Sequence, residues 1–219
     1  LRDRESFDHL LEMCYRPMSA CVFEGNGQFS LEHCRQEYPA YGSSDFRHPA
    51  VEIRQPDGSR ITDFIYQSYS IAPGKPALEG LPATYCEADS EAETLTVRLK
   101  DELLGVTLDL SYTLFAGQPV LSRSARLENG GGLDLHLTAA MSLSLDLPDM
   151  DYEFVHFSGA WGRERWMKAR RLEQGIQSVE SARGHSSHNH NPFIMLRRPG
   201  TGEDSGEVIG FSLVYSGNF

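Results

Sequence analysis

Two runs in which apolar and polar residues alternate constrain the fold of this chain more than any other feature. Residues 106–114 alternate Val, Leu and Tyr with Thr, Asp and Ser, and residues 133–147 place Leu, Ala or Met at every second position. Successive side chains of a strand point to opposite faces, so each run predicts a strand with one apolar and one polar face. The second run has fifteen residues. It therefore predicts one long bent strand or two collinear strands joined by a bulge.

Turn residues separate further candidate strands along the whole chain. Pro56–Gly58 and Asn129–Gly132 have the composition of tight turns, and each predicts a hairpin between its flanking strands. Further breaks are expected at residues 101–105 and 199–206, and a loop at Ala72–Tyr85. Ser6–Met13 carries the one helix signal, an N-cap serine before a short apolar stretch. Strands repeated in this way favour an all-β, antiparallel β-sandwich that occupies residues 1–219 as one domain.

Composition excludes several classes of protein. The formal net charge of −11 disfavours a nucleic-acid partner, and the local basic run at Arg163–Arg171 is interpreted as a strand with a solvated or inter-domain face. The four cysteines have no metal-ligand spacing and are expected to be free thiols in a reducing, cytoplasmic compartment. No apolar run is long enough for a membrane span. Neither a nucleophile elbow nor a phosphate-binding loop is present in the sequence.

Several polar groups were weighed as sites. Asp45 and Arg47 follow an aromatic stretch, and Asp3 and Arg16 form a similar set near the start; such groups suit sugar hydroxyls but also make ordinary salt bridges and turn anchors. The histidines of the 185–190 loop have a spacing that could serve zinc or belong to a structural turn. Trp161 and Trp166 are open to two interpretations, a sugar-binding platform or packing.

Four sequence stretches carry a family resemblance. They are Glu37–Ala50, Phe157–Arg165, the loop Gly184–Phe193 and the terminal stretch Gly206–Phe219. Their order resembles the N-terminal β-sandwich domain of glycoside hydrolase family 36, the bacterial α-galactosidases. The resemblance implies a large, galactose-mutarotase-like supersandwich that lacks strands at both ends. Such missing strands would leave exposed edges, from which we expect self-association.

In that family the chemistry belongs to a (β/α)8 barrel, which this chain does not contain. The resemblance therefore implies an accessory domain that is inactive alone, within a retaining α-galactosidase acting on α-galactoside oligosaccharides such as melibiose and raffinose. It implies no metal or organic cofactor, contact with the catalytic barrel, and a homotetramer. In such a tetramer Asp3 and Arg16, with Asp45 and Arg47 second, would reach the substrate pocket of a neighbouring subunit.

Two alternatives stay open at this point. A lectin-like β-sandwich module that binds sugar by itself has the same strand pattern. Within the family, raffinose and stachyose synthases and α-N-acetylgalactosaminidases are similar in outline, so the sugar specificity of the parent enzyme is not fixed by these motifs.

Overall fold

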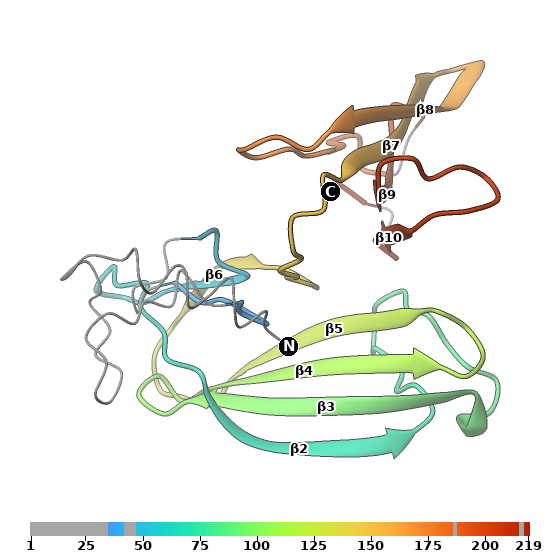
Figure 1. Cartoon of the computed structure of the whole chain (residues 1–219). Helices are drawn as coiled ribbons and strands as arrows, with labels where there is room; N and C mark the ends of the chain where they lie inside the picture. The colour runs from blue at the N-terminus through green and yellow to red at the C-terminus, as the bar shows by residue number, and fades with distance from the viewer. Residues whose placement is uncertain (1–34, 42–46, 186–187, 215–216) are drawn as a thin grey trace, which may run out of the picture. The chain divides into compact units, whose positions relative to one another are not determined.

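The computed structural model describes residues 35–41, 47–185, 188–214 and 217–219 (Figure 1). The chain forms two compact units. Unit 1 comprises Leu1–Pro76 and Cys86–Asp146, and unit 2 comprises Ala77–Tyr85 and Leu147–Phe219. The helix predicted at Ser6–Met13 lies outside the described residues. The only helical element in the described ranges is a 3-10 turn at Asp89–Glu91. The described ranges therefore contain no helix that is long and apolar enough to cross a membrane.

The larger sheet of unit 1 has four strands that are neighbours in sequence and in space (Figure 1). They are β2 (Ile65–Pro73), β3 (Ala92–Asp101), β4 (Val106–Phe115) and β5 (Leu121–Asn129), each antiparallel to the next. In β4, Val106, Leu108 and Leu110 are buried, as the alternation of apolar residues predicts. The break predicted at residues 101–105 is confirmed, since it falls at the turn that joins β3 to its antiparallel partner β4.

The opposite face of this sheet is polar and cross-linked by side chains. Arg98 donates two hydrogen bonds of 2.7 Å each to the carboxylate of Asp109, which lies opposite it on β4. The hydrogen bond from Arg98 lowers the pKa of Asp109 against the opposing effect of burial. Thr94 and Thr113, also directly opposite each other, share a 2.8 Å hydroxyl hydrogen bond. These cross-strand pairs fix the register of β3 against β4.

A second, two-stranded sheet of unit 1 pairs β1 (Val51–Arg54) with β6 (His136–Ala140). Its apolar side chains meet the start of β4 in one core. The buried members are Val51, Ile53, Leu104 and Val106, with Phe64, Leu127 and Leu135 packed against them. Two sheets that bury apolar faces against each other are the basic plan of a sandwich.

Three sequence predictions in unit 1 are wrong. The turn at Pro56–Gly58 exists, but β1 pairs with β6 and β2 pairs with β3, so the two flanking strands do not form a hairpin. Likewise Asn129–Gly132 leads from β5 to a strand of the other sheet. The alternating run at 133–147 contains one five-residue strand, β6, and neither a long bent strand nor a collinear pair.

Unit 2 holds a four-stranded antiparallel sheet in the order β10-β9-β7-β8. Its strands are β7 (Glu153–Ala160), β8 (Arg163–Arg171), β9 (His190–Arg197) and β10 (Val208–Ser212). The break predicted at 199–206 is the turn of the β9–β10 hairpin. The basic run is strand β8, exposed along its whole length, as the sequence predicts.

Candidate functional site

A cavity in the described part of unit 1 lies over the apolar face of the four-stranded sheet. Its volume is about 400 Å³. The floor is apolar and the rim carries aromatic, hydroxyl, amide and carboxyl groups. Floor residues include Val97, Leu99, Leu108 and Leu110, and rim residues include Gln36, Glu37, Tyr38, Thr62, Asp63, Tyr66 and Tyr112. Small-molecule sites commonly combine an apolar lining with a few convergent polar groups.

One end of this cavity is organised by Arg123, from β5. Its side chain is only 4% exposed, and its guanidinium carbon lies 4.3 Å from the ring centre of Tyr112 and 5.5 Å from that of Tyr38. An arginine in this position gains cation–π attraction from both rings and holds them in place. The charge partner is Glu37, with a carboxylate oxygen 3.5 Å from Nη2 of Arg123.

The two tyrosine hydroxyls make short hydrogen bonds at this end of the cavity. Tyr112 donates to the carboxylate of Glu37 at 2.5 Å, and Tyr38 donates to the carbonyl of Met141 at 2.5 Å. Burial, followed by the hydrogen bond to Glu37, raises the pKa of Tyr112. Burial also raises the pKa of Tyr38. Both phenols are therefore neutral at physiological pH, so they act as hydrogen-bond groups and not as bases.

The segment before β1 brings Glu37 and Tyr38 to the sheet. The carbonyl of Pro39 accepts the backbone N–H of Ala50 at 2.8 Å, and Ala40 forms a parallel bridge with Val51. Further on, the backbone N–H of Thr62 donates to the carbonyl of Tyr41. These bonds tie residues 39–41 to the start of β1 and to Thr62, and β1 is itself held in the core.

Of the four predicted substrate-binding residues, the structure describes one. Arg47 forms an ion pair with Asp146 at 2.5 Å, and the same carboxylate oxygen accepts the backbone N–H of Gln36 at 2.8 Å. Arg47 thus forms a salt bridge, which is one of the two roles that its sequence context suggests, the other being a contact with sugar hydroxyls. Asp3, Arg16 and Asp45 lie outside the described residues.

Sequence reasoning missed the grouping of Glu37, Tyr112 and Arg123. Glu37 lies within a sequence block that carries the family resemblance, but its partner Tyr112 is 75 residues away. A weak signal was available, because Arg123 shares one face of its strand with the apolar residues Leu121, Ala125 and Leu127. The role of Arg123 becomes apparent only from the strand register, which places it directly opposite Tyr112.

The other candidate groups of the sequence are dispersed. His185, His188 and His190 are all described, and no group of three or more His, Cys, Asp or Glu among the described residues could hold a metal ion. Cys86 is a free thiol, as the sequence predicts, and its sulfur accepts a hydrogen bond from the backbone N–H of Lys75. The other three cysteines lie outside the described ranges. Trp161 is 88% exposed and Trp166 59% exposed.

Taken together, these features define an all-β antiparallel sandwich domain with a polar-rimmed cavity over one sheet. The model for the glycosyl hydrolase family 36 N-terminal domain matches residues 3–219. The chain therefore belongs to the glycosyl hydrolase family 36 N-terminal domain family.

Known proteins agree with this assignment. The alpha-galactosidase AgaA of Geobacillus stearothermophilus is 52% identical over 87% of this chain, which corresponds to 26% of that protein. The crystal structure of the alpha-galactosidase AgaB from the same bacterium matches with a TM-score of 0.88 and 49% identity, covering 94% of this chain and 28% of that one. AgaA variants solved with stachyose and with raffinose match at TM-score 0.88 and 50% identity, over 93% of this chain and 28% of theirs.

The match confirms the predicted family and the antiparallel β-sandwich class. The chain spans about a quarter of the length of the curated relative, so the remaining three quarters of that protein have no counterpart in this sequence.

Proposed function

We propose that this chain is the N-terminal accessory domain of a retaining α-galactosidase that removes terminal α-linked galactose from oligosaccharides of the melibiose and raffinose type. One observation carries the proposal: the family match extends over residues 3–219, while this length is only about a quarter of the relative AgaA. Glycoside hydrolysis requires two carboxyl groups facing each other across the scissile bond. In this proposal both belong to the remaining part of the enzyme, a catalytic barrel.

The activity of the chain alone tests this division of labour. The purified 219-residue chain should leave a chromogenic α-galactoside untouched, whereas the full-length protein that carries it should hydrolyse the substrate with saturation kinetics. Turnover that follows the purified chain through successive columns would refute the proposal. A matched control is the full-length protein with both barrel carboxylates changed to amides.

The role of the domain is to support the barrel, to take part in a homotetramer and to shape the rim of a substrate pocket. We assign rim contacts to Arg47 and, outside the described residues, to Asp3, Arg16 and Asp45. Because Arg47 also pairs with Asp146, two variants separate the roles. In the full-length enzyme, Arg47→Met should raise KM several-fold, whereas Asp146→Asn should leave KM nearly unchanged if the arginine itself reaches the sugar. Equal effects would reduce Arg47 to a loop anchor.

A cytoplasmic location fits this assignment. Cys86 is a free thiol, which is the usual state of cysteine in a reducing compartment. Cell fractionation with an antibody against the chain tests the location directly. Recovery of the protein mainly from the culture medium would contradict it.

The cavity of unit 1 favours a second candidate function, a carbohydrate-binding module. Its tyrosines and carboxylates suit stacking and hydrogen bonding to a sugar. Calorimetric titration of the chain with galactose and raffinose distinguishes the two functions. Micromolar binding that is lost in Glu37→Gln would support the module, and absence of heat at millimolar sugar would leave the accessory role alone.

A further inference from the structure

The lining of the cavity in unit 1 contains polar groups whose bonding capacity is unused. Thr62 is only 4% exposed, and its Oγ1 atom is buried without a hydrogen-bond partner among the described residues. A buried hydroxyl without a partner costs free energy, so its presence beside a cavity indicates a missing ligand or water. The neighbouring Asp63 donates its backbone N–H to Asp101, but its own carboxylate takes part in no hydrogen bond or ion pair within the described structure.

A bulge in strand β2 places two tyrosines on the face of the sheet that bears the cavity. Tyr66 lies opposite Leu99 of β3 and Tyr69 lies opposite Val97, while Gln67 has no partner on β3. Without this extra residue, the alternation of side chains along a strand would put the two tyrosines on opposite faces. Tyr66 is 55% exposed and lines the cavity, and Tyr69 is 64% exposed. Bulges are frequent next to functional sites, where they redirect a side chain.

The chemistry of the lining limits the kind of ligand. The floor consists of aliphatic side chains of β3 and β4, on which an apolar ring would bury area, whereas a sugar ring would lose hydration without gaining hydrogen bonds. At the rim, Thr62, Asp63 and Glu37 offer a hydroxyl and two carboxylates, which suit sugar hydroxyls. None of the described lining residues is cationic, which disfavours an anion. A volume of about 400 Å³ is at the lower end of small-molecule sites and suits one or two rings.

We propose that this cavity binds a glycoside with an aromatic aglycone, the aglycone on the floor at Val97 and Leu99 and the sugar at the rim. Thr62 and Asp63 bind sugar hydroxyls, and the ring of Tyr66 packs against the ligand from the side of β2. The inference rests on the carbohydrate-binding candidate of the proposed function and deepens it. It names the class of glycoside, and it assigns different residues to the two halves of the ligand.

Calorimetric titration of the 219-residue chain with phenyl α-galactoside, galactose and phenol tests the ligand class. Phenyl α-galactoside should bind at least about tenfold more tightly than either half, because it alone occupies the floor and the rim together. Phenol that binds as tightly as the glycoside would reduce the cavity to an unspecific apolar site. No heat from phenyl α-galactoside at about 10 mM would show that the site takes no such ligand. Either outcome overturns the proposal.

Two variants test the assigned contacts. Thr62→Val replaces the unpartnered hydroxyl by a methyl group and should weaken binding of phenyl α-galactoside at least about threefold. Its melting temperature should stay the same or rise, because the buried hydroxyl makes no hydrogen bond in the free chain. Asp63→Asn changes an exposed residue, keeps the fold and should weaken binding as well. Thr107→Val on the polar face of β4 is the matched control and should bind as the unaltered chain does. Unaltered affinity in both site variants would overturn the proposal.

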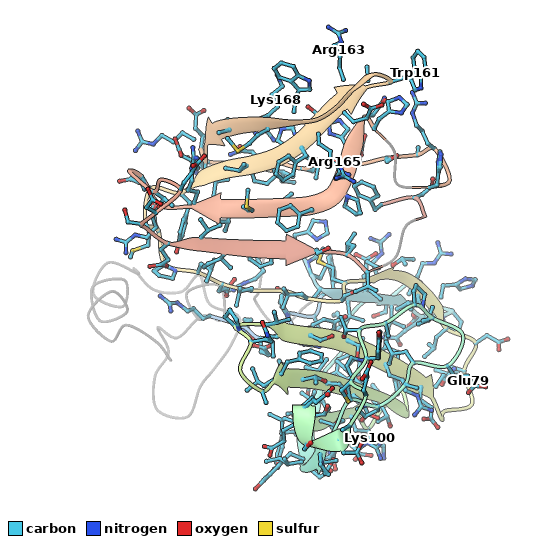
Figure 2. The ribbon with its side chains drawn as sticks, turned by 90° about the vertical axis from the view of Figure 1, so that its right-hand side faces the viewer. Glu79, Lys100, Trp161, Arg163, Arg165 and Lys168 are labelled. Atoms are coloured by element: carbon cyan, nitrogen blue, oxygen red, sulfur yellow. The ribbon has the colours of Figure 1, made fainter. Side chains whose placement is uncertain are left out.

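Unit 2 offers a competing platform for a sugar or an aromatic ring. Trp161 is 88% exposed and projects with Arg163 from the end of the β7–β8 hairpin (Figure 2). Trp161→Ala should leave the affinity for phenyl α-galactoside unchanged, and loss of binding in this variant would overturn the assignment to the cavity. The α-galactosidase assay of the full-length protein is a separate measurement. Failure of the cavity to bind therefore leaves the accessory role intact, and an inactive full-length protein would refute that role without touching the titration.

Discussion

At the scale of single residues, Gly131 shows how one missing side chain steers the path of the backbone. A Cβ atom there would lie 2.1 Å from the carbonyl oxygen of Leu104, which is backbone and cannot give way cheaply. The neighbouring N–H of Gly130 donates to the carbonyl of Gly105 at 3.1 Å. The segment after β5 therefore packs directly on the β3–β4 turn.

We expect Gly131→Ala to lower the free energy of unfolding by roughly 1–3 kcal/mol. Gly132→Ala, where the added Cβ meets nothing within 4 Å, is the matched control in urea unfolding. Equal midpoints for the two variants would contradict this account.

Arg123 gives a second residue-scale prediction: replacing this arginine should cost less stability than replacing its charge partner. Its Nε and Nη2 atoms are buried without hydrogen-bond partners in the described structure, and Glu37 is its one described charge partner. Replacing a buried ion by an apolar side chain of similar volume is often neutral or stabilising, whereas removing its partner leaves the charge uncompensated. Arg123→Met should therefore change the unfolding free energy by less than about 1 kcal/mol, and Glu37→Gln should cost about 1 kcal/mol, limited by the exposure of Glu37. Thermal melts at neutral pH would disprove this if the arginine variant were the weaker one.

At the scale of elements, the local sequence pattern predicted those features of the fold that depend on residues close together in the sequence. β4 has the alternation of the sequence, and the turns at 101–105 and 199–206 join strands that pair with each other. Pairing between distant segments could not be predicted in this way. β6 ends at Ala140, where its partner β1 begins at Val51, and a four-residue partner cannot extend the alternating run of 133–147. The same limit applies to the site, because Arg47 stands in a local motif whereas Tyr112 and Glu37 meet only through the fold.

The sheet of unit 2 gives a prediction for an element. His156 on β7 lies opposite Lys168, its ring centre is 5.7 Å from that of His190 on β9, and Arg170 is close by. Burial and then these positive neighbours lower the pKa of His156 below the ordinary value of 6.5. Because the unfolded chain then binds the proton more tightly, the stability present above about pH 6.5 is lost as the pH falls through and below that value. His156→Gln should flatten the decrease in melting temperature between about pH 7.5 and pH 5.5, and the exposed His136→Gln should not. Parallel pH profiles for all three proteins would exclude this role.

At the scale of the whole molecule, net charge and an exposed edge act against each other. β2 is an edge strand in which Ile65, Tyr66, Tyr69 and Ile71 are each more than half exposed (Figure 1). At neutral pH the net charge of −11 opposes contact between the β2 edges of two copies, but near the sequence pI of about 5.1 this repulsion disappears. We expect light scattering to report growing association as the pH approaches 5, while circular dichroism still shows folded strands.

Ile71→Lys should suppress that association, since a lysine on an edge strand opposes further pairing. Leu103→Lys makes the same exchange at a 90% exposed position in the β3–β4 turn and should not. This association should persist in high salt, because apolar burial is not screened. Suppression by both lysine variants would point to net charge alone and remove the edge strand from the explanation.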